Sequence, residues 1–470
     1  MQYSLRTMKN IDIRTGALAP LLVKLSLPVL AGQVFALLYN LVDTFFIARI
    51  DTSNPWLVGA TGLVFPIYFI FMAASFGITG GVSSLVARAI GAGRTEELDK
   101  TAESGIFLSL AASFICLGFM YPLGDPLLRL FGGSNELLAY GKQYLWWVLP
   151  TVPFMMFNAV FTGILQGEGR TKHMMVSMMI GTIVNIVMDP VLIFGAKIGI
   201  GGAGLATVIG NASSSVYLLV VFLTRKSTVK IHWKISNISF PVMGEIIRVG
   251  LPQSIMNFLA SISFIFYNRI MVSINPMIIT AFTLYSRLEQ LALIPIWAVS
   301  SALSSIAGQA AGAGDFKRMK DSSRVSSLLC FGVCGVLFFV FVISSSRLFG
   351  VFQSDPQVLL LASQIVLWMA LASYLAIPVF MANTIMSVAG FANRSLIFTI
   401  IRIYGLNVPA CILGAYVIGK NLSSTMVAIF VSSVITVIMY LIIEKRFFSS
   451  LEKGTLHISV LKKDEVPVQK

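Results

Sequence analysis

The stretch VSSLVARAIGAG at residues 82–93 returns in altered form as LSSIAGQAAGAG at residues 303–314. A second pair of strings, LSLPVLAGQ at residues 25–33 and VGLPQSIMN at residues 249–257, repeats at a similar offset of about 220 positions. A repeat of this period indicates that the chain contains two copies of one structural unit, each close to half of its length.

The composition places both copies in a membrane. Of the 470 residues, 56% are hydrophobic and 11% are charged, and the mean hydropathy is +0.85. A water-soluble domain could not cover its surface with so few polar groups. Runs of about 20 apolar residues are the signature of membrane helices, and we count twelve of them, six in each copy. The sequence therefore predicts an all-α polytopic membrane protein whose twelve transmembrane helices form two pseudo-symmetric six-helix bundles.

The repeat also predicts the domain boundaries. They are an N-terminal six-helix lobe at residues 1–224, a cytoplasmic basic linker at 225–245, a C-terminal six-helix lobe at 246–446 and a cytoplasmic tail at 447–470. Because each lobe holds an even number of spans, the second lobe starts on the same side of the membrane as the first. An axis along the membrane normal then relates the two lobes.

The basic residues predict the orientation in the membrane. Most of the 34 Lys and Arg residues fall in the N-terminal segment, the even-numbered loops and the C-terminal tail. Such residues are retained on the cytoplasmic side, so both termini of a multi-pass plasma-membrane protein are predicted to be cytoplasmic. The net charge of +14 then reflects topology and attraction to anionic membrane lipid, and no nucleic-acid partner is expected. We expect a monomer.

The sequence offers little for catalysis. Its three His and four Cys residues form no metal-ligand pattern and no pairing of a nucleophile with a base. No GxxxxGK[ST] string occurs, so ATP is not the expected energy source. We therefore predict that the protein is not an enzyme and that it uses no cofactor beyond H⁺ or Na⁺ as a coupling ion.

Polar residues within the apolar runs point to an ion site. The stretch NIVMDPVLIFG, which begins at Asn185, places Asp189 one helical turn later on the same face. Pro190 removes an N–H from the helix and so frees backbone carbonyls beside the carboxylate. With Asp43 in the first span and Thr207 in the sixth, these groups could hold a proton or coordinate Na⁺ through oxygen. A carboxylate near the bilayer centre costs at least ~2.5 kcal/mol, which favours a functional role.

A structural interpretation of the same residues stays open at this point. Asp189 could cap a broken helix, Asn185 could bond a neighbouring helix, and Thr207 could bond back to its own helix. On the functional interpretation, burial disfavours a charged carboxylate and a second carboxylate nearby adds repulsion. Proton exchange at Asp43 or Asp189 is then an expected means of coupling.

The second copy differs at the equivalent positions. The repeat offset places Asp43 opposite Tyr267 and Asp189 opposite about Val408, so only the first lobe carries the acidic pair. The second-lobe charges within or beside helices include Arg287, Glu289 and Arg402. A structural ion pair with a partner on another helix is the favoured interpretation, and a coupling or substrate carboxylate at Glu289 is the alternative.

Two similar bundles that face each other create a central cleft, the usual place for the substrate of a secondary transporter. Rocking one bundle against the other would open this cleft to each side in turn. A channel or scaffold is the competing interpretation, but no filter sequence is present. Pro28 lies fifteen residues before Asp43 and could act as a hinge, as could its counterpart Pro252. A fixed kink is equally compatible with both prolines.

These motifs together resemble those of the multidrug and toxic compound extrusion (MATE) family. The similarity covers nearly the whole chain and rests on SLP and VDTFFIARI in the first span, LVARAIGAG after the second, LQGEGRTK after the fourth, NIVMDPVLIFG in the fifth, GGAGLATVIGN opening the sixth and GQAAGAG after the eighth. The resemblance implies twelve helices in two lobes. It also implies export of small amphipathic, often cationic molecules in exchange for protons or sodium ions.

Within that family the sequence is most similar to the DinF branch. This resemblance implies a cation site formed by Asp43, Asn185, Asp189 and Thr207. It further implies that Pro28 bends and that Tyr39 and Asn158 line the substrate pocket. The NorM-type branch carries acidic residues in its second lobe, where this chain offers only Glu289.

The sequence thus predicts a secondary multidrug exporter that couples proton or sodium antiport to alternating access. A lipid-linked glycan flippase, which we would expect to carry more in-helix arginines, is the alternative within transport. A non-transporting membrane scaffold or receptor is the alternative from another class.

Overall fold

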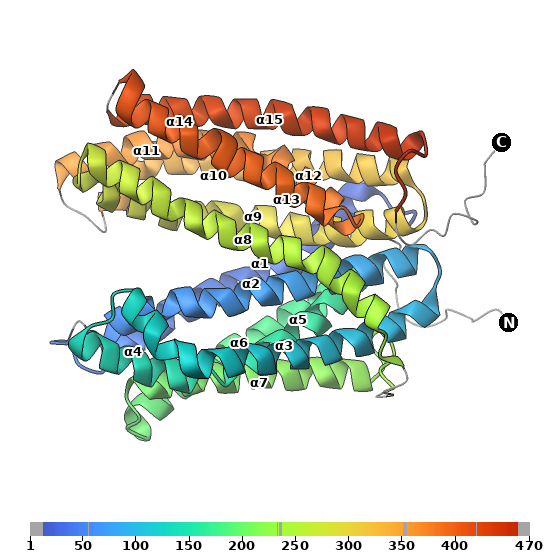
Figure 1. The fold of residues 1–470 in the computed structure, drawn as a ribbon, viewed down its shortest axis with the longest axis horizontal. Helices are drawn as coiled ribbons and strands as arrows, with labels where there is room; N and C mark the ends of the chain where they lie inside the picture. Colours follow the sequence, from blue (N-terminus) through green and yellow to red (C-terminus); the bar gives the residue numbers. More distant parts are fainter. Residues whose placement is uncertain are drawn as a thin grey trace.

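The computed structural model describes residues 13–54, 56–232, 234, 237–350, 355–419 and 421–458. Every regular element in these residues is a helix, and the helices form two bundles that lie side by side (Figure 1). Eleven helical segments are long and apolar enough to cross a membrane, and a bent pair of shorter helices makes a twelfth. The predicted class, twelve membrane helices in two lobes, is confirmed.

The first lobe contains six spans. Its elements are α1 (Leu18–Ala48), α2 (Trp56–Gly91), α3 (Thr95–Leu130), the bent pair α4 (Asn135–Val148) and α5 (Thr151–Glu168), α6 (Thr171–Pro190) continued by the π-helix η1 (Val191–Gly195), and α7 (Ile200–Leu223).

The second lobe repeats this order. Its elements are α8 (Phe240–Ile274), α9 (Met277–Gly312), α10 (Phe316–Gly350), the pair α11 (Pro356–Leu375) and α12 (Ile377–Val388), the interrupted span α13 (Ala392–Ile400), η3 (Ile401–Asn407), α14 (Val408–Leu413) and η4 (Gly414–Ile418), and α15 (Leu422–Glu452).

Both lobes interrupt their fourth span near a proline. In the first lobe α4 and α5 meet at 48°, and Pro150 directly precedes α5. In the second lobe α11 gives way to α12 at Ala376, and Pro378 is the second residue of α12. Proline is favoured at a helix start, where its missing N–H would have no partner within the helix. The shared interruption agrees with the sequence repeat.

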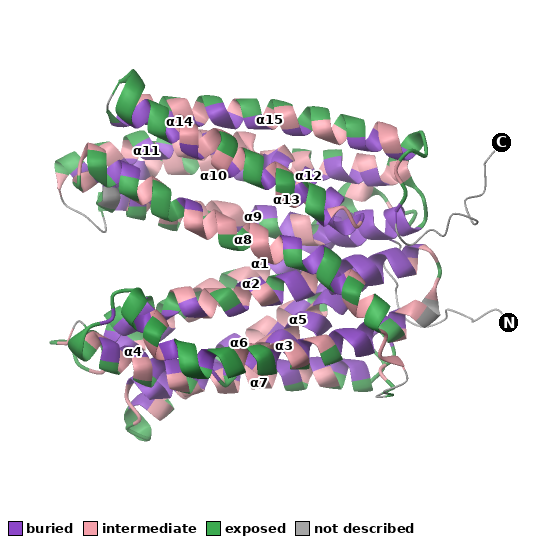
Figure 2. Ribbon diagram, in the orientation of Figure 1, coloured by how far each residue is buried: buried purple, intermediate pink, exposed green. Residues whose placement is uncertain are grey.

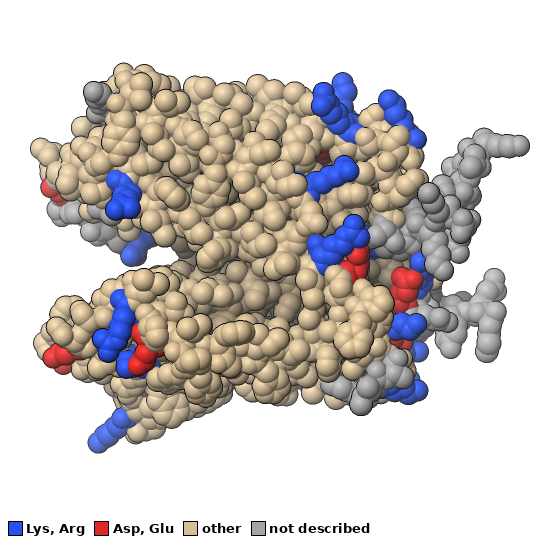
Figure 3. Space-filling view, viewed as in Figure 1, with Lys and Arg blue, Asp and Glu red and all other residues tan. Residues whose placement is uncertain are grey.

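The outer surface suits a membrane. Large apolar side chains are widely exposed there, as at Phe114 (72%) and Ile343 (79%). In the space-filling view the charged residues lie toward the two ends of the molecule, and the belt between them carries almost none (Figure 3). Lipid, rather than water, is the solvent that such a belt requires.

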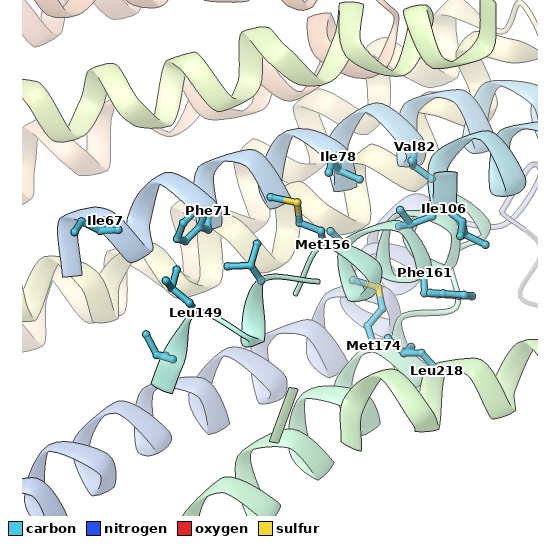
Figure 4. Packing of buried hydrophobic residues seen from close by; sticks show 14 of the residues in the cluster. Ile67, Phe71, Ile78, Val82, Ile106, Leu149, Met156, Phe161, Met174 and Leu218 are labelled. Atoms are coloured by element: carbon cyan, nitrogen blue, oxygen red, sulfur yellow. The ribbon is translucent and has the colours of Figure 1, made fainter. Parts of the chain in front are cut away.

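α2 is central to the core of the first lobe. Figure 4 shows Ile67, Phe71, Ile78 and Val82 along α2 in the buried cluster that also includes Met156 of α5. Lipid tails are as apolar as these side chains, so moving them from lipid into the bundle gains little hydrophobic energy. Close packing and dispersion therefore account for most of the stability of this core.

Glycines bring the two lobes together at one end of the molecule. A Cβ on Gly77 of α2 would lie 2.7 Å from the carbonyl oxygen of Gly250 on α8, and a Cβ on Gly91 would lie 2.0 Å from that of Gln309 on α9. Any larger residue would force the helices apart. Buried residues gather between the lobes at this end (Figure 2), and at the other end the surface is hollowed between them (Figure 3). The molecule is closed at one end and open at the other.

The closed end also holds the beginning of the described chain. Ile13 packs with Ala302 and Ile306 in the last third of α9, close to the glycine contacts of that helix. The ends of α2 at Gly91 and of α9 at Gly312 lie there too. The cleft therefore opens on the side where α1 ends and α2 begins.

Candidate functional site

The four predicted site residues lie on three neighbouring helices of the first lobe. Asp43 comes from α1, Asn185 and Asp189 come from α6, and Thr207 comes from α7, each 8% exposed or less. Asp43 and Asp189 are close enough to interact electrostatically. The hydroxyl of Tyr39, one turn before Asp43, lies 3.1 Å from the Thr207 hydroxyl. The structure thus brings all four residues into one cluster.

Small residues on α7 allow α6 to approach closely enough to form this cluster. A Cβ on Gly210 would lie 2.7 Å from the carbonyl oxygen of Gly181 and 3.0 Å from the Asn185 Cβ. The Ser214 hydroxyl donates to the carbonyl of Ser177 one turn further along. Small and hydroxyl-bearing residues are the usual means of packing membrane helices tightly.

Five buried polar atoms in the cluster have no hydrogen-bond partner. They are one carboxyl oxygen of Asp43, both carboxyl oxygens of Asp189, and the amide oxygen and nitrogen of Asn185. An unsatisfied buried polar group costs about 1–3 kcal/mol, so five in one place require an explanation. The structural interpretation, in which Asp189 caps a helix and Asn185 bonds a neighbour, does not supply one, because these atoms make no such bond.

Thr207 has partners of its own. Its hydroxyl donates to the carbonyl of Ala203 at 3.1 Å, so the Tyr39 hydroxyl must be the donor in their mutual bond. The expected bond from Thr207 to its own helix is therefore present. It leaves Thr207 one further lone pair for another ligand.

Pro190 changes the helix immediately beyond Asp189. The α-helix ends at Pro190 and continues as the π-helix η1, in which the N–H of Ala196 bonds the carbonyl of Val191 at 2.8 Å. Because proline has no N–H, the carbonyl four residues earlier loses its usual partner. π-Helical turns inside α-helices occur frequently at functional sites.

Two tyrosines, Tyr68 and Tyr144, also belong to the cluster, although the sequence pattern does not mark them. Tyr68 of α2 and Tyr144 of α4 both interact electrostatically with Asp43, and Tyr144 also interacts with Asp189. Within apolar runs a tyrosine looks like any other large core residue, so periodicity does not reveal it. The repeat could have marked Tyr68 as a site residue. Residues 82 and 303 are 221 positions apart, and the same offset places Tyr68 opposite Glu289.

The predicted pocket residues occupy two places. Tyr39 lies at the cluster, whereas Asn158 of α5 lies between α5 and α7. The amide of Asn158 donates to the carbonyl of Asn211, and its oxygen accepts from Ser215 at 2.8 Å. Pro28 lies inside α1, fifteen residues before Asp43. Whether Pro28 acts as a hinge stays a prediction.

Glu289 lies inside the second lobe, away from the first-lobe cluster. It borders a small cavity between α9, α10 and α11, with about 30 Å³ of room for water-sized molecules. One of its oxygens accepts from the hydroxyls of Tyr285 at 2.9 Å and Ser373 at 3.1 Å. The favoured ion pair was wrong, because among the described residues neither Arg287 nor Arg402 forms an ion pair with Glu289.

The equivalence of Asp189 with Val408 stays a prediction. Asp189 directly precedes Pro190, and Val408 directly precedes Pro409. The π-helices that follow these prolines begin at residues 191 and 414. Tyr267 remains the counterpart of Asp43, and it interacts electrostatically with Cys411 and Glu289.

The donor set of the first-lobe cluster fits a proton or a small hard cation. Asp43 and Asp189 offer carboxyl oxygens, and Asn185 and Thr207 add an amide and a hydroxyl oxygen. Oxygen ligands of this kind suit Na⁺ better than they suit transition metals. Within the described residues, no three His, Cys, Asp or Glu side chains form a group that could hold a metal ion.

A membrane protein with two pseudo-symmetric helical lobes, a cleft between them and an acidic cluster in one lobe has the features of a secondary transporter. The sequence model of the MatE family matches residues 28–191 and 252–413, one segment in each lobe. The chain belongs to this family. The starts of the matched segments, 28 and 252, differ by 224 positions and their ends, 191 and 413, by 222, in agreement with the repeat offset of about 220.

Individual relatives are similar over most of the chain. The multidrug export protein MepA of Staphylococcus haemolyticus is 26% identical over 343 residues, which cover 72% of this chain and 74% of the relative. The FAD transporter of Shewanella oneidensis is 27% identical over 414 residues, which cover 85% of this chain and 88% of the relative. A solved structure described as an outward-facing multidrug resistance MATE family transporter matches with a TM-score of 0.89 and 25% identity, covering 95% of this chain and all of that one.

Proposed function

We propose that this protein exports amphipathic, often cationic small molecules in exchange for protons or sodium ions, by alternating access of the cleft between its lobes. The five partnerless polar atoms of Asp43, Asn185 and Asp189 are the observation that carries the proposal. A static structural role gives no reason to bury three carboxyl oxygens without partners, whereas a site that takes up and releases a cation needs them free. The MATE relatives named as multidrug exporters support the same conclusion.

The exposure of the two carboxyl groups suggests how the ion enters. Asp43 keeps 8% of its surface exposed, whereas Asp189 is 0% exposed. A proton or Na⁺ arriving from the open side would meet Asp43 first and would then be shared with Asp189 and Asn185. Neutralising the carboxylates lowers the cost of holding them inside the lobe. The occupied and empty forms would therefore favour different packing of α1, which carries Asp43.

The energy available from the ion is sufficient for export. One proton that enters yields ~1.36 kcal/mol per pH unit and ~2.3 kcal/mol per 100 mV of membrane potential. Because ~1.4 kcal/mol corresponds to a tenfold ratio, one proton can drive a gradient of tenfold to a thousandfold. No other energy source is needed.

The proposal includes orientation and assembly. We place the closed end, with the linker and the first and last described residues, Ile13 and Ile458, on the cytoplasmic side of the plasma membrane, so that the structure represents the outward-open state. We place both chain termini on the same side. We further propose that one chain is sufficient for transport, because both lobes and the cleft come from a single chain. Reporter fusions at the C-terminus, active only in the cytoplasm or only outside it, test the orientation.

The decisive experiment is substrate transport in proteoliposomes under an imposed proton or sodium gradient. We expect Asp43→Asn and Asp189→Asn each to abolish gradient-driven export while the protein stays folded, because an amide keeps the shape but cannot take up a proton. Asp51→Asn is the matched control, since Asp51 lies in an exposed loop where its side chain accepts from the N–H and the hydroxyl of Ser53. Full coupled export by both cluster variants would refute the proposal.

The relatives also suggest how to test the substrate class. The Shewanella oneidensis relative is named as a transporter of FAD, which is larger and more anionic than the substrates proposed here. Competition between a cationic dye and FAD in the same proteoliposomes distinguishes the two. We expect the dye to be exported and excess FAD to have little effect on its rate.

A further inference from the structure

Helix α8 changes lobes along its length. Ile246 and Val249, near its start, belong to the buried core of the first lobe, and Gly250 contacts Gly77 of α2. At Met256 it contacts the second lobe, where the hydroxyl of Thr399 donates to the Met256 sulfur at 3.3 Å, and further along the hydroxyl of Tyr404 donates to the carbonyl of Leu259 at 2.8 Å. In Figure 1, α8 accordingly begins beside α3 and continues along α13 and α14 of the second lobe.

Helix α1 makes the reciprocal crossing. Leu21, Leu22 and Leu25, near its start, pack with Ala302 and Ile306 of the second-lobe helix α9. Further along, Gly32 approaches α6 of the first lobe, where a Cβ would lie 2.8 Å from the Met178 sulfur. The first quarter of each crossing helix thus packs on the lobe opposite to the one that its sequence repeat belongs to, and on α1 Leu25 also lies beside Gly169 of the first lobe.

Both crossings occur at a proline. Pro28 separates Leu25 from Gly32 on α1, and Pro252 separates Gly250 from Met256 on α8. A proline interior to a helix removes one hydrogen bond and weakens the helix at that point. Each crossing helix is therefore weakest where it passes from one lobe to the other.

Acidic side chains of the first lobe bind the linker that leads into α8. One oxygen of Glu168 accepts the main-chain N–H groups of Thr228 at 2.8 Å and Val229 at 3.0 Å. Asp99 and Glu103 of α3 accept from main-chain N–H groups further along the linker. Asp99 accepts from the N–H of Lys230 at 2.9 Å, and Glu103 accepts from those of His232 at 2.8 Å and Lys234 at 3.3 Å.

The attachment continues up to the helix itself. The hydroxyl oxygen of Ser104, also on α3, accepts from the N–H of Ser239 at 3.0 Å, one residue before α8 begins. Side chains of α3 and α5 thus satisfy main-chain donors at six positions between 228 and 239. A segment outside helices and sheets must otherwise leave its N–H groups to water. Bonds to carboxylates are among the stronger hydrogen bonds in proteins.

The segment that leads into α1 is attached in the same way to the second lobe. The guanidinium of Arg318 on α10 donates to the carbonyl of Ile13 at 2.7 Å and to that of Gly16 at 2.8 Å. α10 is the repeat counterpart of α3. The first lobe therefore binds main-chain N–H groups of the linker before α8 with carboxylates. The second lobe binds main-chain carbonyl groups of the segment before α1 with a guanidinium.

We infer that the two bodies that rock against each other are not the two halves of the sequence. One body comprises α2–α7, the linker and α8 up to Pro252, and the other comprises α9–α15 and α1 up to Pro28. Asp99, Glu103 and Glu168 are positioning residues that keep the linker and the start of α8 on the first body throughout the cycle. This inference rests on the proposed function, because it assigns the moving parts of an alternating-access exporter.

Disulfide cross-linking in the full chain, with Cys116, Cys330, Cys334 and Cys411 replaced by alanine, tests the inference. The first pair is Ser104→Cys with Ser239→Cys, which ties α8 to α3 within one proposed body. The matched pair is Ser83→Cys with Ser304→Cys, whose hydroxyl oxygens lie 3.4 Å apart across the two bodies. Each pair is joined by oxidation or by a short bis-methanethiosulfonate reagent, and dye export is measured before and after reduction.

We expect the 104–239 link to leave at least half of the export rate, and the 83–304 link to reduce it at least tenfold until reductant is added. Loss of export in the linked 104–239 protein, restored by reductant, would show that the start of α8 leaves the first lobe and would overturn the inference. Full export in the linked 83–304 protein would instead contradict rocking itself, and so the proposed function. The two failures are therefore distinguishable.

Discussion

Ser83 and Ser304 lie with their hydroxyl oxygens 3.4 Å apart at the boundary between the lobes, although 221 positions separate them in the sequence. They are equivalent residues of the two repeats, so the pseudo-symmetry axis passes between them. The contacts around them occur in reciprocal pairs. A Cβ added to Gly91 would lie 2.0 Å from the carbonyl oxygen of Gln309, and a Cβ added to Gly312 would lie 2.0 Å from that of Arg88. The closed end is thus built like the interface of a symmetric dimer.

This reciprocity predicts that Gly312→Ala weakens the closed end. The added Cβ meets main-chain atoms of Arg88, which cannot move aside as a flexible side chain could. We expect a cost of about 1–3 kcal/mol to the closed arrangement, as for other overpacking substitutions. A cysteine placed at Ser83 should accordingly react faster with a thiol reagent in the Gly312→Ala background.

Gly244→Ala is the control for this prediction. Gly244 lies near the start of α8, and a Cβ there has nothing within 4 Å. Alanine is the better helix former by about 1 kcal/mol, so this variant should be as stable as the parent or more so. Equal cysteine reactivity in the two variants would mean that the glycine contacts do not hold the lobes closed.

The bond between Tyr39 and Thr207 predicts a graded loss of ion affinity. Tyr39→Phe removes a donor worth about 1 kcal/mol, so the apparent affinity for the coupling ion should fall about fivefold. Thr207→Val removes the hydroxyl oxygen from the cluster altogether and should lower that affinity about tenfold or more, whereas Thr207→Ser should retain it. The measurement is the export rate as a function of proton or sodium concentration. Identical curves for Thr207→Val and Thr207→Ser would exclude the hydroxyl as a ligand.

Glu103→Ala should loosen the linker. The substitution leaves the N–H groups of His232 and Lys234 without their acceptor, at about 1–3 kcal/mol for each group that water does not reach. Trypsin, which cuts after Lys and Arg, should then cleave the linker about tenfold faster. Glu103→Gln keeps one amide oxygen as an acceptor and should fall between Ala and the parent.

Glu97→Ala controls for the loss of a carboxylate on the same helix. Glu97 pairs with Arg94 at an exposed position, where such a pair contributes little. Trypsin should cleave the linker of the Glu97→Ala variant at the same rate as that of the parent. A cleavage rate for Glu103→Ala no higher than that for Glu97→Ala would show that Glu103 does not restrain the linker.

Arg318→Lys should release the segment before α1. A lysine has a single nitrogen and cannot reproduce the fork in which Nε and Nη2 of Arg318 both donate to the carbonyl of Ile13 while Nη2 also reaches that of Gly16. We expect a lower melting temperature in detergent, by the equivalent of about 1–2 kcal/mol. Arg347→Lys, at an exposed position of α10, should leave the melting temperature unchanged. Equal melting temperatures of the two variants would mean that the fork contributes nothing.

Much of the fold could be predicted from the sequence, because the lipid imposes it. Within hydrocarbon, a single apolar segment can satisfy its backbone hydrogen bonds only as a helix. Each long apolar run was therefore expected to form one. The repeat strings at residues 82 and 303 then fixed the two-lobe arrangement. The grouping of Asp43 with Asn185 and Asp189 was also foreseeable, since intramembrane polar groups seek a common interior rather than lipid.

Other features leave no comparable signal in the sequence. The linker is held by main-chain N–H groups, which every residue except proline possesses, so no pattern marks the partners of Glu103 or Glu168. Tyr68 and Tyr144 look like core aromatics until the packing places them near Asp43.

The reciprocal crossing of α1 and α8 bears on how the protein is made. α1 leaves the ribosome about 260 residues before α9, the helix against which Leu22 and Leu25 finally pack. During synthesis this part of α1 contacts lipid or the insertion machinery until α9 has been made. Neither half can complete its own structure alone, and two separately expressed halves should assemble only when both are present in the same membrane.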